Sequence, residues 1–123
     1  MRFNRSGHMS KSSYAKGLWA EFLARIYLRL HGCRIVCSRY ITGRNTNRAE
    51  IDIIARHKNT LIFVEVKRRN TVQCAWDAIT PHQAMRLRRA AETYILKNRW
   101  NGDARFDVIM VCGHKIHWVK NAI

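Results

Sequence analysis

The chain is a short, strongly basic polypeptide of 123 residues, a length that predicts a single domain. Its hydrophobic content of 47% can fill one core and excludes a wholly disordered chain. Lys and Arg number 23 against 8 Asp and Glu, which gives a formal net charge of +15. This surplus attracts polyanions such as nucleic acid, although an anionic membrane surface or an acidic protein would be attracted by the same field.

The sequence shows no signal for export or for a membrane span. No apolar run reaches the ~18 residues that a transmembrane helix requires, and no apolar stretch follows the basic N-terminal segment. The four cysteines form no CxxC pair, and Cys33 and Cys37 lie in an apolar stretch typical of a core. We therefore expect a reduced, cytoplasmic protein with no membrane contact, made of a flexible basic tail over 1–13 and one domain over 14–123.

Hydrophobic periodicity predicts a first helix over 15–30. Apolar residues recur there with a period of 3.6, and Gly32 follows the last of them, a typical position for a helix to stop. The expected inner face consists of Ala15, Leu18, Trp19, Phe22, Leu23, Ile26, Tyr27 and Leu30.

Strand patterns follow over 33–41, 50–55 and 61–68, with a polar loop over 42–48. Thr80, Pro81 and Gln83 then match the N-cap, N1 and N3 positions of a second helix closed by a capping box. Its expected inner face is Ala84, Leu87, Ala91, Tyr94, Ile95 and Asn98. Two further strands, over 105–112 and 115–119, complete an α/β domain with a mixed central sheet of about five strands flanked by helices, in the order αβββαββ.

Three of the few acidic residues lie inside these strands: Glu50, Asp52 and Glu65. Side chains alternate along a strand, so Glu50 and Asp52 share one face of their strand, and Glu65 and Lys67 share one face of theirs. If the strands form a hairpin with its turn centred at 58–59, Asp52 lies opposite Glu65 and Glu50 lies opposite Lys67. Directly opposed carboxylates are close enough to repel each other.

Such a pair calls for a counter-charge. Mg²⁺ and Mn²⁺ bind carboxylate oxygens and retain water for chemistry, and Lys67 can point at that water or at a phosphate. Two carboxylates, a metal ion and a lysine in a basic protein describe a phosphodiesterase site. The alternative is a set of ordinary salt bridges between the strand acids and Arg48 or Arg68, and the residues alone leave both open.

Two other acids also have two interpretations each. Glu21 lies off the apolar stripe of the first helix, where it either pairs with Arg25 at i+4 or leans over the sheet as a third acid. Asp107 lies beside Arg105 in the strand over 105–112, where a structural ion pair is more usual than a ligand role.

The residues resemble a known signature. Asp52 in EIDII and Glu65-Val66-Lys67 in FVEVK resemble the D…ExK signature of the restriction-endonuclease-like superfamily, with Ile51 in place of a common Pro. Together with GLWAEFLARIYLRLHG, AEIDIIA, DAIT…RLRRAAETYIL and RFDVIMV, they make the chain similar to the YraN-like family of uncharacterised bacterial proteins from about residue 17 to residue 123.

This resemblance implies a restriction-endonuclease-like single domain. It implies Asp52 and Glu65 as ligands of Mg²⁺ or Mn²⁺, Lys67 as the catalytic lysine, and Glu50 and Glu21 as further acidic members of the site. The chain departs from the family pattern in having Ala49 where Gly is usual and Gln83 where Lys is usual. The second departure bears on any phosphate contact from that helix.

We therefore expect a metal-dependent nuclease, with DNA as the favoured substrate. The alternative is a non-catalytic nucleic-acid-binding protein with a vestigial site, and a third hypothesis is an adaptor that docks on an anionic surface. A homodimer would allow two strands to be cut, although no segment marks an interface. The residues expected to contact phosphates are Arg68, Arg69, Arg86, Arg88 and Arg89.

Overall fold

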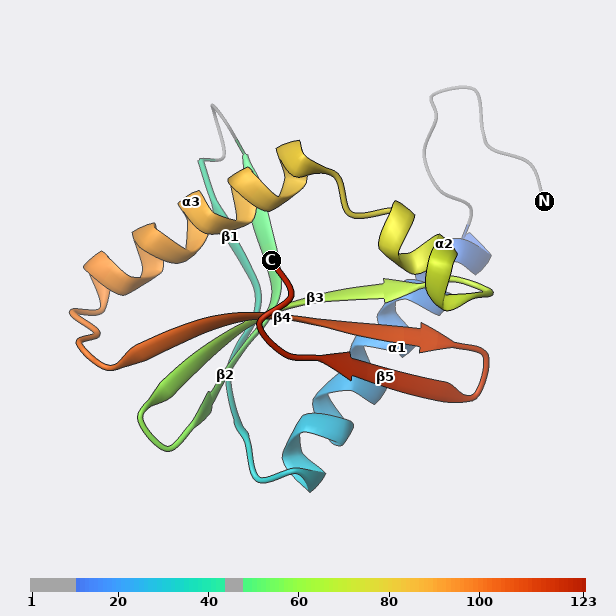
Figure 1. The fold of residues 1–123 in the computed structure, drawn as a ribbon, viewed down its shortest axis with the longest axis horizontal. Helices are drawn as coiled ribbons and strands as arrows, with labels where there is room; N and C mark the ends of the chain where they lie inside the picture. The colour runs from blue at the N-terminus through green and yellow to red at the C-terminus, as the bar shows by residue number, and fades with distance from the viewer. Residues whose placement is uncertain (1–10, 44–47) are drawn as a thin grey trace.

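The computed structural model describes residues 11–43 and 48–123, where helices pack on both faces of one mixed sheet (Figure 1). The five strands of this part of the chain follow their chain order in space, and only β3 and β4 are parallel. The elements are α1 (Lys11–Leu30), β1 (Arg34–Thr42), β2 (Ala49–His57), β3 (Thr60–Arg68), α2 (Val72–Asp77), α3 (Pro81–Lys97), β4 (Asp103–Cys112) and β5 (Lys115–Val119). The predicted α/β arrangement is confirmed, and the short α2 is an addition to it.

The core lies on both sides of the central strand β3, whose residues 61–65 are all buried. On one face, Ala20, Ala24 and Leu28 of α1 pack against apolar residues of β2, β3 and β4. On the other face, α3 packs against β2 and β3, and together with α2 it forms the crossover that joins the parallel strands β3 and β4 (Figure 1). A near-continuous apolar strand is expected where both faces are covered.

The predicted inner face of α1 is wrong in its rotation. Residues 20, 24 and 28 are the fully buried positions, whereas Trp19, Phe22 and Leu30 are exposed, at 57%, 41% and 79%. Periodicity could not find this face because two of its three buried members are alanines, whose small side chains let the helix approach the sheet closely. The predicted stop is confirmed, since α1 ends at Leu30 and Gly32 adopts a left-handed φ of 86°.

The start of α3 agrees with its predicted capping signals in part. Thr80 is the N-cap and its side chain accepts a hydrogen bond from the backbone N–H of Gln83, with Pro81 at the first helical position. The reciprocal half of the capping box is absent, because the Gln83 amide donates to Glu65 of β3 instead. The expected inner residue Asn98 is exposed and caps the C-terminus through the Tyr94 carbonyl.

The strands β2 and β3 form a hairpin whose turn is Lys58–Asn59. The predicted register is confirmed from His57↔Thr60 up to Ile53↔Val64. Beyond that pair β2 and β3 separate, because β2 remains paired with β1 and β3 remains paired with β4. The two strands therefore diverge at Asp52 and Glu65, the two residues that the sequence places opposite each other.

Asp107 is a structural acid, as its position beside Arg105 predicts. It is fully buried on β4, where Arg105 forms a bidentate ion pair with it. The Trp118 indole and the backbone N–H of Asn121 also donate to its carboxylate, each within 2.9 Å. The contacts from Trp118 and Asn121 fasten β5 and the segment that follows it to β4.

The ends of the predicted segments shift slightly. The helix α1 begins at Lys11, within the range 1–13 assigned to a tail, and residues 1–10 of that range lie outside the described residues. Of the cysteines expected in the core, Cys33 is buried and Cys37 is half-buried. Across the described residues, the helices are all too short or too polar to cross a membrane.

Candidate active site

The divergence of β2 and β3 creates the centre of the site. Asp52 projects into the gap, and its Oδ2 accepts a hydrogen bond of 2.8 Å from the backbone N–H of Val66. The carboxylate thus takes the place of a backbone acceptor at the point where the ladder stops. A buried backbone N–H needs such a partner, so the separation of the strands and the identity of Asp52 are linked.

The backbone around Asp52 departs from a regular strand. Ile51 packs on the α3 side of the sheet and Ile53 on the α1 side, although residues two apart normally share a face. On β1, Arg39 lies between the residues that pair with Ile51 and Ile53, and it has a φ of 56°. A left-handed φ is uncommon for arginine, and such conformations concentrate at functional sites.

Glu65 is a buried carboxylate on the α3 side of β3. Lys67 Nζ lies 3.0 Å from its Oε2, so the predicted shared face of these two side chains is confirmed. Gln83 reaches down from α3 and donates to the same oxygen at 2.7 Å. Lys67 and Gln83 together hold Glu65 in one orientation through one of its two oxygens.

Asp52 and Glu65 influence each other electrostatically. Burial raises the pKa of the Asp52 carboxyl well above its usual value, and the nearby charge of Glu65 raises it further. The Val66 hydrogen bond acts in the opposite direction, and the more distant charge of Glu21 adds a smaller upward effect. The acidic pair, half-buried Asp52 and buried Glu65, therefore has two carboxylates beside the single cation Lys67, and a further positive charge would stabilise it.

The chemistry of this pair fits a small divalent cation. Mg²⁺ is usually held by one or two carboxylates and completes its shell with water and substrate phosphates. In the described part of the chain, the N–H groups of Val66, Lys67 and Gln83 contact one oxygen of each carboxylate, Asp52 Oδ2 and Glu65 Oε2. The described residues contain no cluster of three His, Cys, Asp or Glu side chains, so these two carboxylates would be the protein's acidic contribution.

Glu21 faces the sheet rather than Arg25. It forms a bidentate ion pair with Arg39, with Nε–Oε1 and Nη2–Oε2 distances of 3.0 and 3.2 Å, and its side chain is 12% exposed. The rotation of α1 explains this position, because the helix buries the stripe next to Glu21. Glu21 therefore leans over the sheet, as one of its two interpretations expects, but it pairs with Arg39, and the described residues form no cluster of three acids in which it would be the third.

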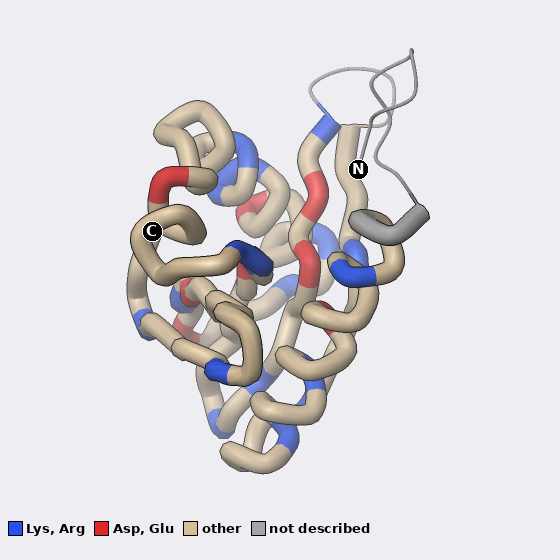
Figure 2. Tube along the Cα trace, turned by 90° about the vertical axis from the view of Figure 1, so that its right-hand side faces the viewer, with Lys and Arg blue, Asp and Glu red and all other residues tan. Residues whose placement is uncertain are grey.

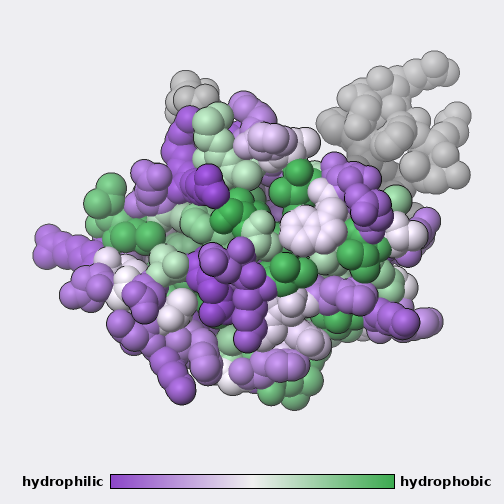
Figure 3. Space-filling model, in the orientation of Figure 1, coloured by the Kyte–Doolittle hydropathy of each residue, from purple (hydrophilic) through white to green (hydrophobic). Residues whose placement is uncertain are grey.

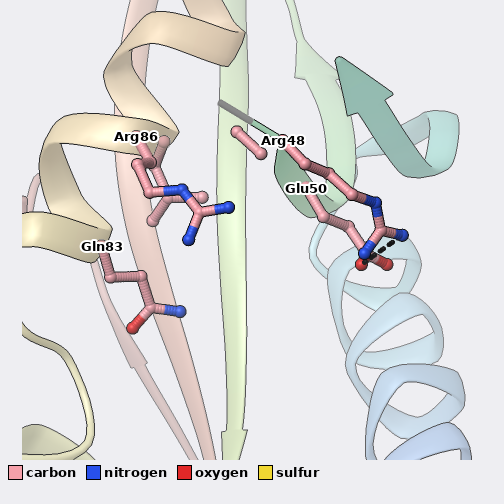
Figure 4. Close-up of a pocket in the computed structure, with 6 residues that line it drawn as sticks. Arg48, Glu50, Gln83 and Arg86 are labelled. Atoms are coloured by element: carbon pink, nitrogen blue, oxygen red, sulfur yellow. Dashed lines mark ion pairs between the residues drawn. The ribbon is translucent and has the colours of Figure 1, made fainter. Parts of the chain in front are cut away.

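Glu50 lies at the edge of the site in a pocket of about 170 Å³ between β2 and α3. Figure 4 shows Gln83 and Arg86 on the α3 side of this pocket and the ion pair of Arg48 with Glu50 on the other side. The predicted pairing of Glu50 with Lys67 is wrong, because β2 and β3 have already separated at this level. The distance from Arg48 Nη2 to Glu50 Oε2 is 4.0 Å, a loose surface contact.

The other predicted phosphate-binding arginines are dispersed. Arg68 is half-buried at the end of β3, beside the exposed Arg69, and Arg89 is exposed on α3. Arg88 lines a separate pocket with the C-terminal residues Ala122 and Ile123. Lys and Arg positions occur on many sides of the trace in Figure 2, and hydrophilic side chains cover much of the face in Figure 3 with apolar patches among them. Arg86 is the one of these five that lines the pocket beside the acidic pair.

The comparison with known proteins decides the family. The sequence model of the family described as "Uncharacterised protein family UPF0102" matches residues 20–111. The chain belongs to this family. It is 40% identical over 108 residues to a UPF0102 protein of Shewanella denitrificans, a match that covers 85% of this chain and 94% of the relative. A UPF0102 protein of Vibrio cholerae is 39% identical over 119 residues, with 91% and 94% covered.

The UPF0102 match contains every side chain that forms this site, from Glu21 on α1 to Arg86 on α3. Three of them, Arg39, Arg48 and Gln83, are not among the site residues predicted from the sequence. Arg39 and Arg48 carry no signal in a chain so rich in arginine. For Gln83, the signal is its place where the resembling family usually has Lys, on the first turn of a helix above the sheet.

Proposed function

We propose that this UPF0102 protein is a metal-dependent nuclease that hydrolyses phosphodiester bonds in DNA. The observation that carries the proposal is the half-buried Asp52 beside the buried Glu65, with Lys67 Nζ 3.0 Å from Glu65, in a chain of net charge +15. The similarity of these residues to the D…ExK signature of the restriction-endonuclease-like superfamily supports the same reaction.

Asp52 and Glu65 would hold Mg²⁺ or Mn²⁺. When bound there, the ion would supply a positive charge to the scissile phosphate and lower the pKa of a water molecule. The Val66 N–H and the Gln83 amide fix one oxygen of each carboxyl group. This arrangement leaves the pair oriented before any ligand arrives, which is the condition for strong electrostatic stabilisation of a transition state.

Lys67 is the cation placed to act on the reacting group. The Lys67 side chain is only 15% exposed, so solvent screens the charge of its ammonium little. We assign it to the phosphoryl oxygens, whose negative charge grows in the transition state, and to the orientation of the attacking water.

Arg48 and Arg86 are assigned to the flanking phosphates. They line opposite sides of the pocket beside Glu50, and both are available to a chain that crosses the pocket (Figure 4). Arg39 is a positioning residue, because its ion pair fixes Glu21 near Asp52 and does not reach the acidic pair itself.

The test is a cleavage assay with purified protein on single-stranded, duplex and branched DNA and on RNA, in Mg²⁺, in Mn²⁺ and in EDTA. We expect metal-dependent cleavage of at least one DNA, and its loss in Asp52→Asn and Lys67→Ala. An Asp103→Asn variant is the matched control, since Asp103 is an exposed acid at the start of β4. Cleavage that persists in EDTA or in Asp52→Asn would overturn the proposal.

One observation favours a second candidate, a nucleic-acid-binding protein without catalysis. The acidic pair has no third His, Cys, Asp or Glu beside it among the described residues, and Lys67 already partners Glu65. In that case the wild-type protein binds DNA in EDTA and cuts none of the substrates in either metal.

A further inference from the structure

The outer side of α1 carries an exposed aromatic surface. Trp19 and Phe22 are 57% and 41% exposed, and their rings stack with centroids 5.4 Å apart and planes 27° from parallel. Tyr14 and Leu18, on the same helix, are 50% and 39% exposed. We call Trp19 and Phe22 the aromatic platform. Large exposed apolar groups that gather in one place mark an interaction surface.

The charges around the platform are positive. Arg25 lies with its Cζ 5.9 Å from the centre of the Phe22 ring, and Lys16 and Arg29 are exposed on the same helix. The one acid among α1 residues 14–30 is Glu21, which turns inward to Arg39. The platform therefore combines π faces with cations and exposes no carboxylate, the combination by which proteins bind single-stranded nucleic acid.

The platform lies on the helix that carries Glu21. Glu21 is on the same helical turn as Trp19 and Phe22 and faces the sheet through its ion pair with Arg39, whereas the platform is on the outer side of α1. The thickness of one helix, ~10–12 Å, therefore separates the platform from the α1 face of the sheet, and Glu65 lies farther away because its side chain is on the α3 face. A strand with one phosphate at Asp52 and Glu65 would reach the platform with nucleotides some positions away from that phosphate.

We propose that the aromatic platform binds a single-stranded segment of DNA by stacking of its bases on Trp19 and Phe22, away from the bond that is cut. This inference rests on the proposed function and adds a substrate class to it: DNA with an unpaired strand. Bases inside a duplex are already stacked and cannot reach the platform, so the preference would be for single strands, flaps or junction ends. A second copy of this chain is a poorer occupant, because two molecules of charge +15 repel each other.

The experiment measures the anisotropy of a fluorescein-labelled oligodeoxythymidylate and of a labelled duplex, both in EDTA so that no cleavage occurs. We expect Trp19→Ala, and separately Phe22→Ala, to weaken single-strand binding by about 5- to 150-fold, the effect of losing one stacked base. Duplex affinity should change by less than about twofold, because the cations are untouched. Trp19→Phe keeps a ring and should retain most of the affinity.

Leu18→Ala is the matched control. Leu18 is an exposed apolar residue on the same helix but has no ring, so its loss should leave single-strand binding unchanged. Equal losses in Leu18→Ala and Trp19→Ala would overturn stacking. Unchanged single-strand binding in Trp19→Ala and Phe22→Ala would also overturn it. If these variants instead lose self-association in sedimentation, or lose binding to phosphatidylglycerol vesicles, the platform binds a second copy of the chain or a membrane surface and the inference is wrong.

The outcomes separate this inference from the proposed function. If single-strand binding depends on Trp19 and Phe22 but the protein cleaves none of the substrates, this inference is supported and the nuclease proposal is wrong. If the protein cleaves DNA but its single-strand affinity is unchanged in Trp19→Ala and Phe22→Ala, the nuclease proposal is supported and this inference is wrong.

Discussion

The backbone N–H of Val66 on β3 donates to the side chain of Asp52 on β2 at 2.8 Å, just past Ile53↔Val64, the last pair of the β2–β3 ladder. This hydrogen bond ends the hairpin and holds the first acid of the site. It also places Asp52 beside the residue that follows Glu65, so the sheet itself brings the two carboxylates together. The site is therefore built into the topology of the sheet and does not depend on a loop.

The first prediction concerns the metal. Mn²⁺ should raise the melting temperature of the wild-type protein, because a ligand that binds only the folded state stabilises it by about 2.7 kcal/mol at a hundred times its dissociation constant. Asp52→Asn should abolish this response, and Asp103→Asn should retain it. Thermal unfolding by circular dichroism with and without Mn²⁺ measures the shift. Equal shifts in wild type and Asp52→Asn would show that the ion binds elsewhere.

The second prediction concerns pH in the absence of metal. The folded-state pKa of Asp52 is raised above its value of about 3.9 in an unfolded chain, so the folded protein binds the proton more tightly. Its stabilising effect is complete below the unfolded pKa and is lost as pH rises through the folded pKa. The free energy of unfolding in EDTA, measured by urea titration, should therefore fall over this range relative to that of Asp52→Asn. A constant difference between the two proteins would contradict the raised pKa.

Much of this site was readable from the sequence, because its central residues lie in regular strands. A period of two and a short turn fix the hairpin register, and the register brings Asp52 and Glu65 to the same level. The separation of the strands beyond Ile53 was not readable. The separation depends on the pairing of β2 with β1 and of β3 with β4, which continues where the β2–β3 pairing has ended. Because the strands are separated at Glu50, its side chain contacts Arg48 rather than Lys67.

The contribution of the helices was harder to predict. Hydrophobicity alone favours Trp19 and Phe22 as core residues of α1, but close packing on the sheet selects Ala20 and Ala24. That choice is made by the shape of the whole sheet, which no single segment encodes. The side-chain target of Gln83 was out of reach for the same reason, since it depends on where α3 settles above β3.

The third prediction separates a structural acid from a site acid. Asp107→Asn should lower the free energy of unfolding by about 3–5 kcal/mol, because it removes one partner of a buried ion pair and leaves Arg105 uncompensated. The Mn²⁺ response should persist, since Asp107 binds the C-terminal segment and not the acidic pair. Urea titration gives the stability, and a loss below about 1 kcal/mol would contradict this assignment.

The fourth prediction concerns the phosphate contacts. Affinity for duplex DNA in EDTA should fall steeply with salt, with a slope near −0.9 for each phosphate neutralised. Arg86→Ala should reduce the slope by about 0.9, because Arg86 lines the pocket beside the acidic pair. Arg88→Ala, on the part of α3 that faces the C-terminal residues, should reduce it less. A wild-type affinity that does not change with salt concentration would argue against nucleic acid and for a protein partner.

The last prediction concerns Lys67 and decides between an enzyme and a binding protein. If Lys67 stabilises charge that appears only in the transition state, Lys67→Ala lowers the rate of DNA cleavage without weakening DNA binding. Groups with this role are worth about 10²–10³ in rate. Affinity in EDTA should be nearly unchanged, because Lys67 is one of 23 basic residues and its ammonium is engaged with Glu65 in the free protein.

Two measurements on the same variant test this: the cleavage rate in Mg²⁺ or Mn²⁺, and the DNA affinity in EDTA. Lys97→Ala is the control, since Lys97 is exposed in the last turn of α3, away from the acidic pair, and its loss should affect neither measurement beyond a small change in salt-dependent affinity. Removal of Lys67 also leaves Glu65 with only the neutral Gln83 amide as a partner on Oε2, so a metal ion should bind the variant at least as tightly as it binds the wild type. A Lys67→Ala variant that keeps its metal-induced rise in melting temperature but cuts as fast as the wild type would end this mechanism, because the acidic pair would then act without the cation beside it.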